Sequence, residues 1–167
     1  MSYLVDTNVV AELSRRAPNP HVVAWFRDVP DTALHLSVLT LGELRKGVES
    51  LADARKKERQ RVWLENDLAE WFGERLLPVT AAVADRWGRL LAEAGRPVPA
   101  VDSLLAATAV HHGLRMVTRN SQDFVFPGLD VVNPWERQED EGSAAGGRRT
   151  QTGSRRERPP GETDPET

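Results

Sequence analysis

The 167-residue chain contains no cysteine, and its charges nearly balance. The absence of cysteine excludes a disulfide scaffold, a zinc–thiolate site, an iron–sulfur cluster and a cysteine nucleophile. With 22 Lys and Arg against 25 Asp and Glu, the formal net charge is −3, so any contact with nucleic acid must come from a local basic patch. No apolar run approaches the roughly 20 residues of a membrane helix, and the chain reaches Asp6 without a signal-peptide pattern. We therefore expect a cytoplasmic protein that makes no membrane contact.

Composition divides the chain after Trp135. Residues 136–167 contain no Val, Ile, Leu, Met, Phe, Trp or Tyr, and eight of these 32 residues are Gly or Pro. Such a segment buries too little apolar surface to offset the entropy lost on ordering. We predict one folded domain over 1–135 and a disordered, charged, Gly/Pro-rich tail over 136–167. A weak electrostatic contact between the arginines of the tail and nucleic acid is an alternative role for this segment.

Hydrophobic periodicity predicts strands that alternate with helices along the folded part. The predicted strands are 3–5, 34–38, 76–79, 114–118 and 129–132, and the predicted helices are 9–13, 22–29, 41–51, 64–72, 83–94 and 102–112. This alternation indicates an α/β fold with a parallel sheet and helices on both faces. Functional sites in such folds lie outside the carboxyl ends of the strands, where we expect Asp6 and Asp123 to face one crevice.

Four carboxylates stand out by position, and each also has a local structural interpretation. Asp6 and Asp102 could cap helices, Glu43 could complete a capping box with Thr40, and Asp123 could close a turn. Together they would repel one another, since two unit charges about 5 Å apart cost roughly 3 kcal/mol at an effective dielectric constant of about 20. Such a cluster holds protons or a cation, and Mg²⁺ and Mn²⁺ prefer oxygen ligands of this kind. These ions activate water for phosphodiester hydrolysis without a His, Cys or Lys nucleophile.

Five segments occur in the order and spacing of a known family. They are 4–8 (LVDTN), 37–47 (SVLTLGELRKG), 99–109 (PAVDSLLAATA), 117–124 (VTRNSQDF) and 132–135 (VNPW). Through them the chain resembles the PIN-domain ribonucleases, and most closely the toxins of the VapC (FitB-like) type. The resemblance implies a three-layer α/β/α PIN-like fold over 1–135, with a central, mainly parallel sheet of four to five strands.

The resemblance also implies an activity and a metal site. The activity is that of a divalent-metal-dependent endoribonuclease, the toxin of a toxin–antitoxin pair, with Mg²⁺ or Mn²⁺ as cofactor. The catalytic and metal-binding residues carried over are Asp6, Glu43, Asp102 and Asp123. Of these, Asp6 and Asp102 are expected as direct ligands, and Glu43 and Asp123 partly through water.

Two further residues are expected to support the site. Thr118 is a hydrogen-bonding partner within it, or otherwise an ordinary strand end. Asn120 replaces an Asp that many relatives carry, so that the number of bound ions, one or two, stays open. The remaining partners that the resemblance implies are an RNA substrate, a VapB-like antitoxin, a second copy of the chain in a homodimer, and operator DNA only through the antitoxin.

The densest basic run of the body suggests where RNA is held. The run consists of Arg55, Lys56, Lys57, Arg59 and Arg61, and it is a candidate patch that tracks RNA phosphates. The alternative is a solvated helix face that is paired with Asp53, Glu58 and Glu65. Arg119, beside the predicted site, is a further candidate for a phosphate contact. The alternative function is a non-catalytic PIN-fold binding module within a DNA-binding repressor complex with an antitoxin.

Overall fold

Five parallel strands form the centre of the computed structural model, which describes residues 1–136. The strands are β1 (Tyr3–Val5), β2 (Leu34–Ser37), β3 (Leu76–Leu77), β4 (Arg115–Val117) and β5 (Val131–Val132). Their order in the sheet is β3-β2-β1-β4-β5, and every pairing is parallel. The predicted α/β fold is confirmed. The predicted tail lies outside the described residues, apart from its first position.

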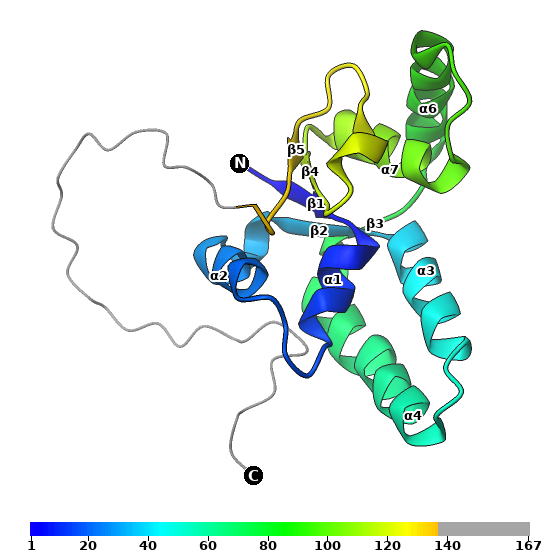
Figure 1. Ribbon diagram of the computed structural model, residues 1–167. Helices are drawn as coiled ribbons and strands as arrows, with labels where there is room; N and C mark the ends of the chain where they lie inside the picture. The colour runs from blue at the N-terminus through cyan, green and yellow to red at the C-terminus, as the bar shows by residue number, and fades with distance from the viewer. Residues whose placement is uncertain (137–167) are drawn as a thin grey trace, which may run out of the picture.

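Helices cover both faces of this sheet, which completes the three predicted layers (Figure 1). On one side lie α1 (Thr7–Leu13), α2 (Pro20–Asp28), α3 (Val38–Glu49), α4 (Ala54–Val62), the π-helical segment η2 (Trp63–Leu68) and α5 (Ala69–Phe72). On the other side lie α6 (Ala81–Ala94) and α7 (Ala100–His112). Within residues 1–136, no helix combines the length and the apolar character that crossing a membrane requires.

The central strands face two apolar cores, one on each side of the sheet. Leu4 and Met116 are fully buried against α6 and α7, whereas their neighbours Val5 and Val117 are fully buried against α1 and α3. Successive side chains of a strand point to opposite faces, so a strand covered on both faces needs apolar residues at every position. This explains why β1 is a continuous apolar run in the sequence and why the two buried positions of β4, Met116 and Val117, are both apolar.

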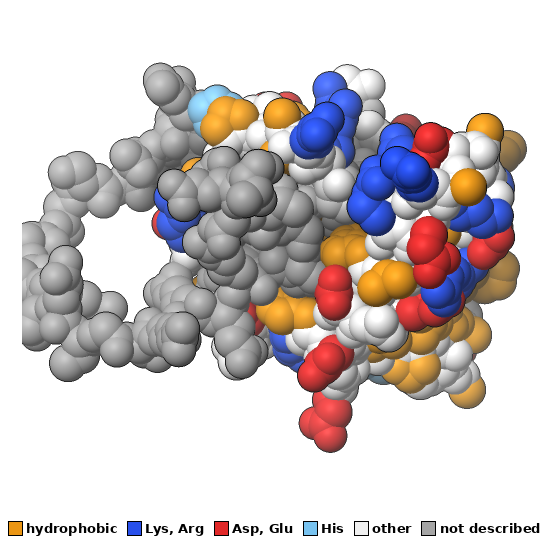
Figure 2. All heavy atoms as spheres, turned by 90° about the horizontal axis from the view of Figure 1, so that it is seen from below, with side chains coloured by type: hydrophobic (Ala, Val, Ile, Leu, Met, Phe, Trp, Pro, Cys, Tyr) orange, Lys and Arg blue, Asp and Glu red, His pale blue; other side chains and the backbone are white. Residues whose placement is uncertain are grey.

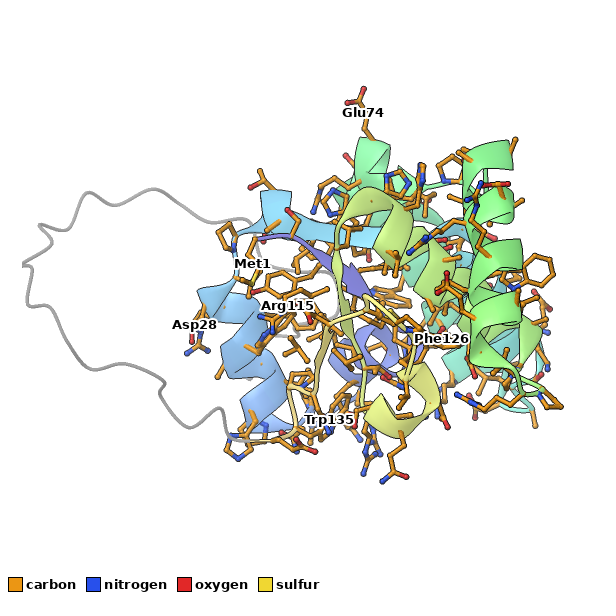
Figure 3. All side chains as sticks on the ribbon, turned by 90° about the horizontal axis from the view of Figure 1, so that it is seen from above. Met1, Asp28, Glu74, Arg115, Phe126 and Trp135 are labelled. Atoms are coloured by element: carbon orange, nitrogen blue, oxygen red, sulfur yellow. The ribbon has the colours of Figure 1, made fainter. Side chains whose placement is uncertain are left out.

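The order of the strands places a reversal between β1 and β4. From β1 the chain adds β2 and then β3 on one side, and it returns through α6 and α7 to place β4 on the other side of β1 (Figure 1). At the amino ends of these two strands, the Arg115 guanidinium donates to Met1 Sδ at 3.1 Å, and the two side chains lie together in Figure 3. The carboxyl ends, at the opposite edge, form the switch point at which α/β folds bind ligands.

Candidate active site

Asp6 and Thr118 meet at this switch point, directly after β1 and β4. The Asp6 N–H donates to the Val117 carbonyl at 2.9 Å, and the Thr118 hydroxyl donates to Asp6 Oδ2 at 2.6 Å. Asp6 Oδ1 accepts the Thr7 N–H at 2.7 Å, so Asp6 also caps α1, as its local interpretation predicted. Thr118 is fully buried and Asp6 is 7% exposed. The carboxylate is therefore held rigidly by both strand ends.

Asn8 completes this arrangement, although the sequence analysis assigned it no role in the site. Its Nδ2 donates to Asp6 Oδ2 at 2.9 Å and to Thr118 Oγ1 at 3.2 Å. Its Oδ1 accepts the Arg119 N–H at 3.1 Å, while the Asn120 N–H donates to Thr118 Oγ1 at 3.1 Å. One amide thus joins the start of α1 to the loop after β4. Asn8 does belong to one of the five family segments, 4–8 (LVDTN), and that segment was the signal in the sequence that could have indicated it.

Glu43 and Asp102 come from α3 and α7, and neither caps its helix. Ser37 is the N-cap of α3, so Glu43 lies in the helix interior, and the capping-box interpretation was wrong. Pro99 precedes α7, so Asp102 lies within the first turn rather than at the N-cap position, and that interpretation was also wrong. Glu43 Oε2 instead accepts the hydroxyl of Thr7. Both carboxylates are half-buried, and neither occupies the N-cap position of its helix.

The loop after β4 carries the remaining predicted residues at the exposed margin of the site. Asp123 lies in a 3₁₀ turn, Ser121–Phe124, which its N–H closes by donating to the Asn120 carbonyl at 3.0 Å. Asp123 and Asn120 are both exposed. The Arg119 guanidinium lies over the Trp135 ring, with Cζ 5.4 Å from the ring centroid. The Arg119 side chain is therefore packed against Trp135, while its backbone borders the site.

Electrostatics link the four carboxylates into one cluster. Burial raises the pKa of Asp6, the hydrogen bonds from Thr118 and from the first N–H of α1 lower it, and the charges of Glu43 and Asp102 raise it further. The pKa of Asp102 is raised by burial, then by the charges of Asp123 and Glu43. The charges that act on Asp6 and Asp102 therefore come from acids in other, separate parts of the chain. The cluster carries excess negative charge that a cation would neutralise.

The donor set suits a hard divalent cation that keeps much of its water. Every donor here is a carboxylate, hydroxyl or amide oxygen, the type that Mg²⁺ and Mn²⁺ prefer. Within residues 1–136, no group of three or more acidic or histidine side chains is arranged to enclose an ion by itself. Mg²⁺ typically binds proteins through only one or two carboxylates and completes its shell with water and substrate oxygens. The residues therefore fit a hydrated ion better than a closed protein cage.

A groove of about 930 Å³ adjoins the cluster between α1, α3 and α4, with Thr7 and Glu43 in its wall. Its basic lining residues are Arg15, Arg16, Lys56 and Arg59. Figure 2, which views the molecule from the end where α1 and α4 lie, shows basic side chains gathered in neighbouring groups on this face. The groove thus joins an acidic end to basic walls.

The structure divides the predicted basic run of α4 into two sets. Lys56 and Arg59, three residues apart on one helix face, line the groove. Lys57 instead pairs with Glu49 at 2.8 Å, and Arg55 is exposed without lining the groove. The alternative interpretation, an ion-paired helix face, therefore describes Lys57, while Lys56 and Arg59 have no ion pair within the described part of the chain.

Comparisons with known proteins agree with this fold. The family model of the PIN domain matches residues 3–126. The toxin FitB of Neisseria gonorrhoeae is 36% identical over 135 residues, which cover 79% of this chain and 97% of FitB. The VapC ribonuclease Y4jK of Sinorhizobium fredii is 33% identical over 136 residues, which cover 80% and 97% of the two chains. A solved structure of FitAB bound to an IR36 DNA fragment matches with a TM-score of 0.75 and 32% identity, covering 82% of this chain and 98% of that one.

An α/β/α sandwich with acidic side chains at its switch point defines the class of protein. The chain belongs to the PIN-domain family and, within it, to the toxins of the VapC and FitB type. The resemblance noted in the sequence is confirmed.

Proposed function

We propose that this protein is an endoribonuclease toxin that hydrolyses RNA phosphodiester bonds with the help of Mg²⁺ or Mn²⁺. The observation that supports this proposal is electrostatic: the pKa of Asp6 is raised by burial and then by the charges of Glu43 and Asp102, and the pKa of Asp102 by burial and then by the charges of Asp123 and Glu43. The similarity to a VapC ribonuclease supports the same activity.

Asp6 and Asp102 are the proposed ligands, and the chain prepares them differently. Three donors fix the Asp6 carboxylate, from Thr7, Asn8 and Thr118. Second-layer hydrogen bonds of this type orient a ligand and typically account for about 10–100-fold in metal affinity or activity. Asp102 lies in the first turn of α7, and its pKa is raised by burial and then by the charges of Asp123 and Glu43. When bound, a divalent ion supplies a water of lowered pKa and neutralises charge on the leaving oxygen.

Glu43 and Asp123 are proposed to act at the edges of the site. The Thr7 hydroxyl donates to Glu43 Oε2 and so fixes that carboxylate beside Asp6, where it can accept a proton from a water molecule. Asp123 is exposed on the 3₁₀ turn and adds negative charge next to Asp102. Asn120 offers a neutral amide at the same margin.

An antitoxin is the proposed protein partner, supported by membership in the VapC and FitB group and by the DNA-bound FitAB structure. Operator DNA is proposed as a partner only through that antitoxin. The homodimer, the cytoplasmic location and the division of the chain at 135 stay predictions.

RNA cleavage by purified variants tests the proposal. The wild type is incubated with total bacterial RNA in Mg²⁺, in Mn²⁺ and in EDTA, and the same assays are run on Asp6→Asn and Asp102→Asn. We expect cleavage only with metal and a loss of at least 100-fold in both variants. Asp85→Asn is the matched control, because Asp85 is an exposed acid paired with Arg89 on α6. Undiminished cleavage by Asp102→Asn would overturn the proposal.

Calorimetry separates the enzyme from the alternative, a non-catalytic binding module. We expect Mg²⁺ to give a binding heat with the wild type that is lost in Asp6→Asn. No binding heat, together with no cleavage of RNA, would favour the binding module. Circular dichroism of each variant checks that the fold is retained.

A further inference from the structure

The groove between α1, α3 and α4 has a distribution of charge that selects its ligand. We propose that it binds the phosphate backbone of a single-stranded RNA segment that leads away from the acidic cluster, with Arg16, Lys56 and Arg59 as the phosphate contacts. This inference rests on the proposed ribonuclease function and adds to it the path of the substrate.

The position of the groove connects it to the reaction site. Thr7 and Glu43, which are joined by a hydrogen bond, belong both to the acidic cluster and to the wall of the groove. Leu44, Val48 and Trp63 also line the groove, and they are at most 8% exposed. The buried apolar residues keep the groove open as a rigid surface, and the cations lie at its margins. A chain cut at the cluster would therefore enter or leave between these cations.

Three of the four cations that line the groove have no ion pair among the described residues. Arg16, Lys56 and Arg59 are exposed and have no ion pair within residues 1–136, while Arg15 contacts Glu12 at 3.1 Å. Glu43 is the sole acidic residue among those lining the groove. The uncompensated charge of the groove is therefore positive at its margins.

The opposite pattern holds for the cations between α3, α4 and the π-helical segment η2. There Arg61 pairs with Glu58 at 2.7 Å and with Glu65 at 2.5 Å, and Arg45 pairs with Glu65 at 2.8 Å and with Glu49 at 3.5 Å. These pairs neutralise that surface, although each exposed pair contributes little stability. Lys56 and Arg59 of α4 therefore line the groove without an ion pair, whereas Lys57 and Arg61 of the same helix are paired with acids.

RNA fits this distribution better than an acidic segment of a protein does. A positively charged groove that follows the backbone is the general mode of single-strand binding. An acidic peptide would satisfy the basic margins and then meet the carboxylates at the Glu43 end. A phosphodiester chain satisfies the same margins, and its phosphate at the cluster is the group on which a metal-dependent nuclease acts.

Binding and its salt dependence test the assignment. The probe is a fluorescein-labelled 12-nucleotide oligouridylate, a length of about twelve nucleotides being within the range that single-strand grooves cover. Fluorescence anisotropy is recorded in the cleavage-deficient Asp102→Asn background, without and with Lys56→Gln/Arg59→Gln. We expect the double change to weaken binding about tenfold or more and to lower the slope of log K against log salt by about 1.4, because each lost phosphate contact removes about 0.7. Arg55→Gln and Lys57→Gln are matched controls on the same helix, expected to change the affinity less than twofold.

Cleavage kinetics and a second probe decide between the outcomes. With Asp102 intact, Lys56→Gln/Arg59→Gln is expected to raise KM about tenfold while kcat changes less than twofold, and Arg16→Gln is expected to add to that effect. Unchanged KM and unchanged RNA affinity, in a protein whose wild type cleaves RNA, would overturn the groove assignment and leave the ribonuclease function standing. A wild type without metal-dependent cleavage would instead overturn the function. The second probe is a labelled oligoglutamate peptide. If it binds the wild type as tightly as the RNA does, and if Lys56→Gln/Arg59→Gln abolishes this binding, the groove is assigned to an acidic protein segment instead.

Discussion

The hydroxyl of Thr118 donates a 2.6 Å hydrogen bond to Asp6 Oδ2, and this bond joins the carboxyl ends of β4 and β1. It lies at the reversal of strand order, where Asp6 is almost completely buried. A buried carboxylate without partners favours its neutral form, and a hydrogen bond to the charged form opposes that tendency. Thr118 therefore orients Asp6 and favours its ionised form, while burial and the charges of the neighbouring acids act in the opposite direction.

Replacing Thr118 by Val tests this role, because Val has nearly the same shape and no hydroxyl. Since the hydrogen bond from Thr118 lowers the pKa of Asp6, its loss raises that pKa, and the acidic limb of the pH–rate profile moves to higher pH. We expect cleavage near neutral pH to fall about 10–100-fold, the usual effect of removing an orienting partner of a ligand. Rates measured from pH 5 to pH 9 check both effects.

Thr108→Val is the control for this change. Thr108 is equally buried, and its hydroxyl donates to the Leu104 carbonyl within α7 rather than to a carboxylate. We expect its pH–rate profile to coincide with that of the wild type. Equal losses in the two variants would show that the effect of Thr118 is one of packing alone.

Two substitutions of Asn8 separate its roles as a donor and as a neutral group. Asn8→Ala removes the 2.9 Å hydrogen bond to Asp6, and Asn8→Asp removes it and adds a negative charge at the same place. Both changes raise the pKa of Asp6, and the added charge raises it further. We expect the acidic limb of the profile to move to higher pH in the order wild type, Ala, Asp, with the lowest rate for Asp. The reverse order of the two variants would contradict this electrostatic account.

Asp102→Asn should stabilise the protein when no metal is present. The pKa of Asp102 is raised above its ordinary value of 3.8, so ionisation opposes folding. The penalty is absent below the ordinary value, grows as the pH rises through the interval up to the raised value, and is complete above it. In EDTA at pH 7, we expect the unfolding midpoint of the variant to exceed that of the wild type by about 2–4 °C. At pH 3 the two midpoints should coincide, and saturating Mg²⁺ should stabilise only the wild type.

The elements that the sequence predicts well are those with an apolar face. The strand at residues 3–5 buries Leu4 and Val5 completely, and two predicted helices bury Val22 and Val83 completely. The periodicity of these segments is visible in the sequence. The helix α4 was not predicted from periodicity because none of its residues is buried. A helix that packs only weakly carries no apolar stripe. Its charged residues indicate a solvated surface, but they do not show where the helix begins and ends.

The site follows the same division between local and tertiary information. The order of the family segments indicated the four acids. Capping rules gave wrong local interpretations for Glu43 and Asp102, because α3 begins directly after Ser37 and α7 directly after Pro99, a few residues earlier than those interpretations required. The role of Asn8 depends on Thr118, which lies 110 residues away, and a contact of this kind has no periodic signal. The groove depends on the packing of three helices, so the sequence showed its cations but not which of them face it.

Arg75 provides a final prediction, on stability rather than on activity. Its guanidinium donates to the carbonyls of Asp31, Leu34 and Trp71, and its Cζ lies 5.2 Å from the centroid of the Trp71 ring. Arg75→Met keeps an apolar stem but leaves these carbonyls without their donor, so we expect a loss of about 2–4 kcal/mol in the free energy of unfolding, measured with urea. Arg89→Met, which removes only an exposed pair with Asp85, should cost less than about 0.5 kcal/mol. Because Arg75 contacts none of the four carboxylates, the folded variant should keep the wild-type kcat, and a loss of kcat would connect the edge of the sheet to the site.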